Sequence, residues 1–379
     1  MPTIGIITRY APSTRAITAT DAAALADALA RSDDGLRVLL YCAGGRYDGA
    51  HAKESEPGRF ETVRLDASDP AKTGVSRLLN SVVVGMRLAW ASRHCDVVVA
   101  QTDPPLVGLW VGLLRALRRR PWADWTMDLY PDAFVAAGLA GPRALPVRLI
   151  QWLQRRLRPT LTIALGDGQS AYLVQIGRAG ARTEVLPCGV PRSSSPPPAA
   201  GADDARGVSA TYAGNIGQAH DVDRVAAALF GFADAGAAVT VAPSGAKADA
   251  LRAAVAQRPE IQLRASMSHA ELAQVDFHVA SLADAWTHLC VPSKAVTAAS
   301  LGAHVIFLGR ADSDSARLAG QRCLVLPPTL SLDEIRAECR RLAEQGRPRD
   351  PDDPRVPAQH RYTAGLASVS RSLRDLCAA

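Results

Sequence analysis

Short apolar runs alternate with longer amphipathic stretches along most of the chain. The first set of runs predicts strands at residues 3–8, 36–42, 96–100, 122–127, 160–164 and 184–186. Stretches with helical periodicity lie between them, at residues 21–31, 75–93, 106–117 and 145–157. A second alternation predicts strands at residues 209–213, 238–242, 261–264, 276–280, 304–308 and 323–326. Strands alternating with helices are typical of an α/β fold with parallel sheets, so we expect two Rossmann-like domains.

The two alternations are separated by a segment with the composition of a linker. Residues 192–207 read RSSSPPPAAGADDARG, which is rich in proline, serine and small residues. We therefore predict an amino-terminal domain over residues 1–191, a carboxy-terminal domain over 208–350 and a helical tail over 351–379. The cleft between two such domains is the usual place for a two-substrate site.

Composition narrows the class of protein further. The chain has 379 residues, of which 48% are hydrophobic and 21% charged, which is typical of a globular protein, and its formal charge is +6. No basic stretch is interleaved with aromatic residues, so we expect no nucleic-acid partner. The seven cysteines are scattered without a C-x-x-C pair and indicate neither disulfides nor zinc, as expected in a reducing cytoplasm. The start, MPTIGIITRY, lacks a charged leader, so export is not expected.

One stretch has the pattern of a phosphate site. Residues 291–309 read VPSKAVTAASLGAHVIFLG, with Pro292, Ser293 and Lys294 at the expected start of a helix. Free backbone N–H groups and the positive end of the helix dipole attract an anion there, and Lys294 adds a full charge. The alternative is an ordinary α/β repeat with a surface lysine.

A second anion-ready turn follows the strand at residues 209–213. The sequence YAGNIG at residues 212–217 contains small residues that let the backbone approach an anion closely. A tight strand–helix turn explains the same residues without a ligand. Two such sites in one domain favour a diphosphate, and together with two lobes they indicate a nucleotide-sugar.

The amino-terminal half offers candidates at the carboxyl ends of its strands, where open α/β sheets bind ligands. Thr14 and Arg15 lie in the loop after the first strand, which has no G-x-G-x-x-G fingerprint. Asp128 follows the strand at residues 122–127, and we interpret it as a group that points into the crevice. The alternative is that Asp128 caps the next helix. We interpret the D-x-D-like Asp312-Ser313-Asp314 as a helix cap and not as a metal site.

The expected helix at residues 145–157 is both apolar and basic. Leu149, Leu153 and Leu157 share one face, with Ile150 and Trp152 beside them, and arginines lie mostly on the other. A core-facing helix with a solvated side accounts for this pattern. A helix lying on a membrane surface, with its arginines on anionic head groups, is the alternative.

Six short motifs together resemble a known family. They are TDPP at 102–105, DLYPD at 128–132, LGDG at 165–168, LPCGV at 186–190, YAGNIG at 212–217 and VPSK at 291–294. In this order they resemble the GT-B glycosyltransferases of family 4, closest to the branch with the N-acetyl-L-fucosamine-type transferases. The resemblance implies a GT-B fold with two Rossmann-like domains facing across a cleft.

The resemblance also implies an activity. A sugar would pass, with retained anomeric configuration, from a UDP- or GDP-sugar to an acceptor hydroxyl or thiol, in surface-glycan or secondary-metabolite (antibiotic or thiol) biosynthesis. The acceptor would be a small molecule or lipid-linked, in the cytoplasm or at the inner membrane face, and neither a metal nor another cofactor is expected. Implied roles are catalysis for Asp128 and Lys294, donor binding for Gly214, Asn215, Gly217, Gln218, Pro292, Ser293, Lys294 and Thr297, and acceptor binding for Thr14, Arg15, Asp103 and Tyr130.

The chain departs from the family pattern at the donor side. Leu289 and Thr297 stand where the family has two glutamates, the second of which normally holds the ribose, and Gln218 stands where many relatives have an arginine. These departures keep open a catalytically inactive sugar-nucleotide-binding subunit. A GT-B-like nucleotide-sugar epimerase is a further alternative. A two-lobed solute-binding protein is disfavoured by the missing leader.

Overall fold

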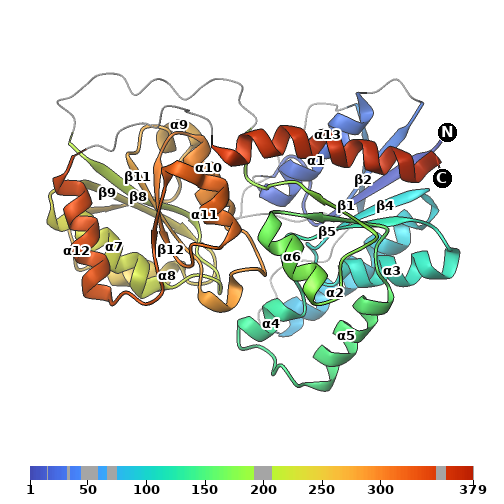
Figure 1. The fold of residues 1–379 in the computed structure, drawn as a ribbon, viewed down its shortest axis with the longest axis horizontal. Coiled ribbons are helices and arrows are strands. Elements are labelled where there is room, and N and C mark those ends of the chain that lie inside the picture. The colour runs from blue at the N-terminus through green and yellow to red at the C-terminus, as the bar shows by residue number, and fades with distance from the viewer. Residues whose placement is uncertain are drawn as a thin grey trace. The chain divides into compact units, whose positions relative to one another are not determined.

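The computed structural model describes residues 1–14, 16–31, 35–43, 59–65, 75–191, 207–346 and 356–378 of the chain (Figure 1). The described chain forms two compact units. The first consists of Met1–Cys188 together with Arg361–Ala379, and the second of Gly189–His360. The expected linker at 192–207 lies outside the described residues except for Gly207, as does Arg15.

The first unit is built on a parallel sheet, seven-stranded within the described residues, in the order β3-β2-β1-β4-β5-β6-β7. Its central strand β4 reads VVVAQ and is buried at every position, as expected for β-branched residues between two helical layers. The strands are β1 (Thr3–Thr8), β2 (Arg37–Ala43), β3 (Glu61–Leu65), β4 (Val97–Gln101), β5 (Trp122–Trp125), β6 (Leu161–Ala164) and β7 (Arg182–Val185).

Helices connect these strands. Within the unit, α2 packs against α3, and α3 packs in turn against α5. The alanine-rich α1 begins at Ile17, earlier than the expected residue 21. The helical segments are α1 (Ile17–Ala30), α2 (Val75–Ala91), η1 (Ser92–His94), α3 (Val107–Arg118), α4 (Asp132–Ala136), α5 (Leu145–Arg156) and α6 (Asp167–Gln175).

The second unit repeats the architecture with a parallel sheet, six-stranded within the described residues, in the order β10-β9-β8-β11-β12-β13. Its strands are β8 (Ser209–Asn215), β9 (Ala238–Ser244), β10 (Ile261–Leu263), β11 (Phe277–Ser281), β12 (His304–Leu308) and β13 (Cys323–Leu326). Its helical segments are α7 (Val222–Asp234), α8 (Ala248–Val255), α9 (His269–Leu272), η2 (Asp284–Trp286), α10 (Ser293–Ser300), α11 (Asp314–Ala319), η3 (Gly320–Arg322) and α12 (Leu332–Glu344).

The core of the second unit lies between its sheet and the helices α7, α8 and α12. Helices α7 and α12 approach closely at Gly231, where a Cβ atom would come within 2.2 Å of the Arg336 carbonyl oxygen. Only glycine therefore fits at this crossing. The predicted α/β architecture is confirmed for both units, and Ser313 caps α11 as expected, accepting from the Ala316 N–H.

The last helix, α13 (Pro357–Ala378), had no clear partner from sequence. In the structure its residues from Arg361 onward belong to the first unit, where the helix runs along the sheet (Figure 1). Ser368 and Ser372 donate hydrogen bonds to the two carboxylate oxygens of Glu184 at 2.8 and 3.0 Å. The first unit is thus completed by the two ends of the chain.

Strand order reverses once in each sheet. In the first unit the reversal lies between β1 and β4, and in the second between β8 and β11. Loops leaving the carboxyl ends of the strands on either side of such a point form the ligand-binding crevice of doubly wound folds. These two places are therefore where a site is expected.

Candidate active site

In the second unit, Lys294 is held at the carboxyl end of β8. Lys294 lies in the first turn of α10, whose N-cap is Pro292, and its side chain is partly buried. The Nζ atom donates to the Tyr212 hydroxyl at 2.7 Å, to the Asn215 carbonyl and to His220 Nε2 at 3.0 Å. The two motifs that the sequence singled out for phosphate, at 212–217 and 291–294, are therefore joined by one ammonium group.

The geometry fixes the tautomer of His220. Its Nδ1 lies 2.6 Å from the Ser281 carbonyl oxygen, which can only accept, so Nδ1 carries the proton. Its Nε2 is then a lone pair directed at the ammonium of Lys294. Burial, reinforced by the charge of Lys294, lowers the pKa of His220 well below its ordinary value, so the imidazole stays neutral. No motif in the sequence indicated this role of His220.

Burial also acts on Lys294 itself. Loss of water around the ammonium lowers the pKa of Lys294 to about 7. The surroundings supply a lone pair, a carbonyl and a hydroxyl, and within the described residues no carboxylate pairs with this ammonium. A bound anion would favour the protonated form of Lys294.

The end of β8 and the turn that follows it are partly exposed. Gly214 has a positive φ of 114°, a conformation that glycine adopts without strain, and Asn215 and Gln218 are exposed. Lys247 stabilises the turn, because its Nζ donates to the Gln218 carbonyl at 3.4 Å and to the His220 carbonyl at 2.7 Å. Gln218 is thus held by its backbone carbonyl, which accepts from Lys247. Gly217 lies between this contact and the Asn215 carbonyl, which accepts from Lys294.

The start of α10 meets a second loop of the same unit. Pro292, the N-cap of α10, makes no side-chain capping hydrogen bond. Gly189 has a φ of 76°, and a Cβ atom there would come within 2.7 Å of Ser293 Cβ. Thr297 is buried and donates its hydroxyl to the Gly189 carbonyl at 2.6 Å. Thr297, which occupies the place of the family's second glutamate, is therefore used to tie the Gly189 loop to the helix.

In the first unit, Asp128 and Asp103 form an acidic pair at the carboxyl ends of β5 and β4. The backbone N–H of Asp128 donates to the Thr102 hydroxyl at 2.9 Å. Helix α4 begins only at Asp132 with Pro131 as its N-cap, so Asp128 is not the cap of that helix. Burial, with the negative charge of Asp103 as a second cause, raises the pKa of Asp128 to about 7. Asp103 itself pairs with Arg9 at 3.8 Å.

A carboxyl group with such a pKa is suited to exchange protons near neutral pH. Efficient general acids and bases have pKa values close to the working pH. Asp128 can therefore gain or lose a proton near neutral pH.

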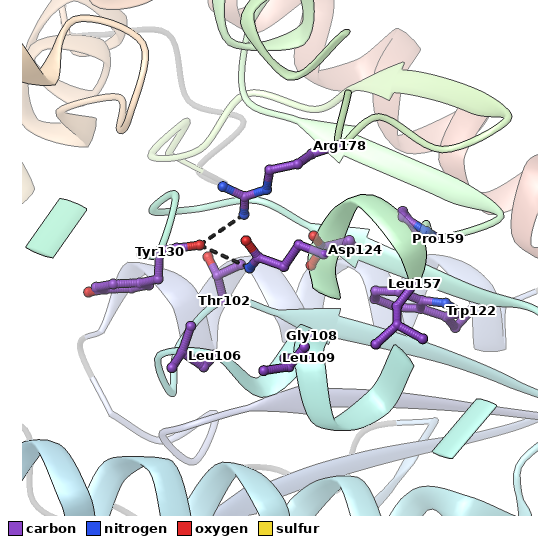
Figure 2. A pocket seen from close by; sticks show the side chains of 11 residues that line it. Thr102, Leu106, Gly108, Leu109, Trp122, Asp124, Tyr130, Leu157, Pro159 and Arg178 are labelled. Atoms are coloured by element: carbon purple, nitrogen blue, oxygen red, sulfur yellow. Dashed lines mark hydrogen bonds between the residues drawn. The ribbon is translucent and has the colours of Figure 1, made fainter. Parts of the chain in front are cut away.

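The other predicted acceptor-side residues are engaged locally. Thr14 is buried, and its hydroxyl donates to the Ala11 carbonyl at 2.8 Å. Tyr130 offers its backbone carbonyl to Gln154 Nε2 and to Arg178 Nη2, both at 2.9 Å, and its ring packs on Phe134 and extends away from these groups (Figure 2). The structure therefore brings Asp103 and Asp128 together and leaves Thr14 in a separate turn.

A small cavity that the sequence did not suggest lies in the first unit, and Thr102, Asp124 and Arg178 are among the residues that line it (Figure 2). It measures about 20 Å³, room for one water molecule. Asp124 on β5 reaches it, and its buried Oδ1 has no hydrogen-bond partner among the described residues. Burial raises the pKa of Asp124 to about 6, against the charge of Arg178. An acidic residue within the strand sequence WADW was the one available signal.

Comparison with known proteins places the fold. No protein-family model and no curated protein matches the sequence. Among solved structures, the chain is similar to sucrose-phosphate synthase from Thermosynechococcus elongatus, with 15% identity, a TM-score of 0.66 and coverage of 99% of this chain and 98% of the other. It is also similar to WaaG, a glycosyltransferase involved in lipopolysaccharide biosynthesis (13%, TM-score 0.61, 98% and 99% covered).

A third similar structure carries a ligand. HepE from Anabaena, solved in complex with UDP-glucose, is 14% identical to this chain, with a TM-score of 0.58. The match covers 98% of this chain and 100% of HepE. Likeness at such identities shows the fold alone. The chain has the GT-B fold of two Rossmann-like units, as the sequence predicted.

Proposed function

We propose that the protein is a glycosyltransferase that uses a nucleotide-sugar donor. The observation that carries the proposal is the placement of Lys294: in the second unit of a GT-B fold, the start of α10 and the end of β8 converge on one ammonium at the point where strand order reverses. The UDP-glucose complex of the similar HepE supports a donor of this class. We propose Gly214, Asn215, Gly217 and Gln218, with Pro292, Ser293 and Thr297, as the donor-side residues.

In the proposed reaction, an acceptor hydroxyl or thiol attacks the anomeric carbon while the bond from that carbon to the diphosphate oxygen breaks. The acceptor proton passes to the departing diphosphate or to Asp128, and the configuration of the sugar is retained. Negative charge grows on the leaving diphosphate. Lys294 and the N–H groups at the start of α10 stabilise this charge, so that a metal ion is not required.

The ammonium of Lys294 has three N–H donors, and its three protein acceptors use all of them. A phosphate oxygen therefore binds in exchange for one of these contacts. The lone pair of His220 is the weakest of the three in geometry, at 3.0 Å, and we expect this contact to be the one exchanged. His220 would then act as a resting place for the lysine when no donor is bound.

Asp128 and Asp103 are the proposed acceptor-side groups of the first unit, and we keep Thr14, Arg15 and Tyr130 as acceptor-side candidates from the sequence. The acceptor is a small molecule or a lipid-linked sugar at the inner membrane face, in surface-glycan or secondary-metabolite biosynthesis. The resemblance to family 4, and to its fucosamine-transferase branch, belongs to this proposal.

An inactive sugar-nucleotide-binding subunit is the second candidate. It is favoured by Thr297, whose hydroxyl is committed to the Gly189 carbonyl and leaves the ribose without the family's carboxylate. Such a subunit would bind donor and release nothing.

A donor panel separates the two. Purified protein is incubated with UDP-, GDP- and dTDP-sugars, and nucleoside diphosphate release and thermal shift are measured together. Release that persists in EDTA supports a metal-independent transferase. A thermal shift without release, with candidate acceptors present, supports the inactive subunit, and a new sugar nucleotide formed from donor alone identifies an epimerase. Neither shift nor turnover with any donor overturns both.

A further inference from the structure

Helix α5 presents an apolar and basic face to solvent. The sequence favoured a core-facing helix with Leu149 and Trp152 on or beside its buried face, and this interpretation is wrong for both residues. In the structure Leu145 is 80%, Leu149 56% and Trp152 49% exposed, and Leu139 in the preceding loop is 70% exposed. On an isolated surface helix this much apolar area in contact with water is unfavourable.

The inward face of α5 explains the reversal. Gln154 donates to the Tyr130 carbonyl, Gln151 donates to the Asp132 carboxylate at 2.9 Å, and Val147 is buried. These two glutamines satisfy polar groups at the start of α4, so the inward side of the helix includes polar as well as apolar residues. Leu145, Leu149 and Trp152 are left exposed on this helix, which lies at the lower edge of the first unit in Figure 1.

The charge around this face has one sign. Between residues 133 and 166 the sequence contains no aspartate or glutamate, while arginines stand at 143, 148, 155, 156 and 158, and all five are exposed. Arg148 and Arg156 lie one turn before and one turn after Trp152, and the Arg156 guanidinium stacks over its ring at 5.6 Å. None of these five guanidinium groups is recorded in an ion pair with a carboxylate of the described chain.

From these observations we propose that α5 and the loop before it are a docking surface for an anionic lipid bilayer. Leucine and tryptophan enter the boundary between head groups and acyl chains, and the surrounding arginines meet the phosphates. Exposed aliphatic side chains set among unpaired arginines fit a bilayer better than a folded acidic protein, which offers carboxylates but no fluid apolar layer. No described helix is long and apolar enough to cross a bilayer, so the contact is one of a surface helix.

Helix α2 is the natural comparison. It also exposes apolar side chains, with Trp90 56% exposed and Arg93 stacked on its ring at 4.5 Å. However, only Arg87 and Arg93 lie between residues 80 and 93, against five arginines between 143 and 158. Because more arginines without a carboxylate partner among the described residues surround α5, we assign the bilayer contact to α5 and not to α2.

The proposal is independent of the reaction, because vesicle binding is measured without donor or acceptor. The full-length protein is sedimented with vesicles of phosphatidylcholine alone or of phosphatidylcholine with phosphatidylglycerol, over a range of salt. We expect binding to the anionic vesicles only. The variant Leu149→Gln with Trp152→Gln should reduce the partition coefficient at least tenfold, and Arg148→Gln with Arg156→Gln should reduce it roughly 25-fold, at about fivefold per arginine.

Matched controls lie on α12 of the second unit. Leu332→Gln changes a leucine that is 46% exposed, and Arg340→Gln with Arg341→Gln removes the same net charge as the α5 pair. Both controls should bind like the wild type. Equal losses in the α12 and α5 arginine variants would show that net charge alone causes binding and would overturn the proposal.

Brominated acyl chains test insertion directly, since they quench only tryptophan that enters the bilayer. Quenching should disappear in Trp152→Phe, which keeps an apolar ring, and persist in Trp90→Phe. Loss of quenching in Trp90→Phe instead would place the contact on α2. Retention by immobilised polyglutamate with no vesicle binding would identify an acidic protein as the partner, against the proposal.

Discussion

Replacement of Lys294 by methionine tests the proposed site most directly. Methionine keeps much of the aliphatic volume and removes the charge. The Nζ atom stands where three elements of the second unit meet, and no carboxylate of the described chain neutralises it. Loss of a preorganised donor to a developing oxyanion costs about 3–4 kcal/mol, or roughly 100- to 1,000-fold in kcat. We expect Lys294→Met to lose at least about a hundredfold in nucleoside diphosphate release.

The acidity of Lys294 adds a second, sharper readout. With its pKa lowered to about 7, the free protein holds this proton on about half of its molecules at pH 7 and on about one in a hundred at pH 9. Since the bound diphosphate favours the ammonium, donor affinity should fall as pH rises through 7, by up to roughly 50-fold at pH 9. The sugar-diphosphate diester does not titrate in this range. Lys294→Met should bind donor weakly and independently of pH.

Other ionisable groups around Lys294 do not produce this profile. His220 and His278 have pKa values lowered by burial, that of His278 to about 3, so both stay neutral across the range. Burial raises the pKa of the Tyr212 hydroxyl, which stays protonated. The Cys290 side chain acts to raise the pKa of Lys294, so Cys290→Ser should keep the fall in affinity and move it to lower pH.

The measurements are initial rates of diphosphate release and calorimetric titration with the best donor of the panel. Lys247→Met is the matched control, because Lys247 supports the same turn through the Gln218 and His220 carbonyls without standing at α10. Its rate should fall less than about tenfold. Circular dichroism melts check that both variants fold. A near wild-type rate for Lys294→Met, with affinity still falling above pH 7, would refute the assignment.

Three further predictions concern the first unit. Asp128→Asn should lower kcat at least tenfold and abolish any limb of its pH profile near 7, whereas a retained limb assigns that proton elsewhere. The pKa of Asp124 is raised from 3.8 to about 6, so the folded state binds this proton more tightly and the free energy of unfolding falls as pH rises from about 4 to 6. In urea unfolding, Asp124→Asn should remove about 3 kcal/mol of that fall. An unchanged pH dependence of stability would contradict this prediction. Arg115 is buried and donates to the carbonyls of Cys95, Asp96 and Pro121, so Arg115→Met should cost about 3 kcal/mol or more, and a loss below 1 kcal/mol would show that water replaces it.

Much of the fold could be predicted from patterns of residues that lie close together in the sequence. Buried strands such as β4 and the short helix caps depend on residues close in sequence, and Ser313 is an example of a cap read correctly from three residues. Strand β3 was missed because its sequence, ETVRL, is mostly exposed at the sheet edge and lacks an apolar run. An edge strand has a neighbouring strand on one side only and is more exposed than a central strand, so it needs no continuous apolar run.

The candidate site divides in the same way. Strand ends and turn residues predicted which loops carry chemistry, and the meeting of Lys294 with the turn after β8 follows from the parallel order of the sheet. The tautomer of His220 and the cavity beside Asp124 depend on atoms from distant elements, and no spacing in the sequence encodes them. For α5 the periodicity gave two faces but not the choice between them, because the inward glutamines bond to Tyr130 and Asp132, which belong to another element.

Thr297, which departs from the family pattern, has a structural role of its own. From the sequence alone, the missing glutamate suggests a weakened site. In the structure the threonine hydroxyl donates to the Gly189 carbonyl, a bond that an ionised glutamate cannot make, because a carboxylate only accepts. Glycine at 189 is in turn required by the close approach to Ser293. Thr297 and Gly189 therefore depend on each other, because the threonine bonds to the loop that packs against Ser293. The start of α10 is held by this loop.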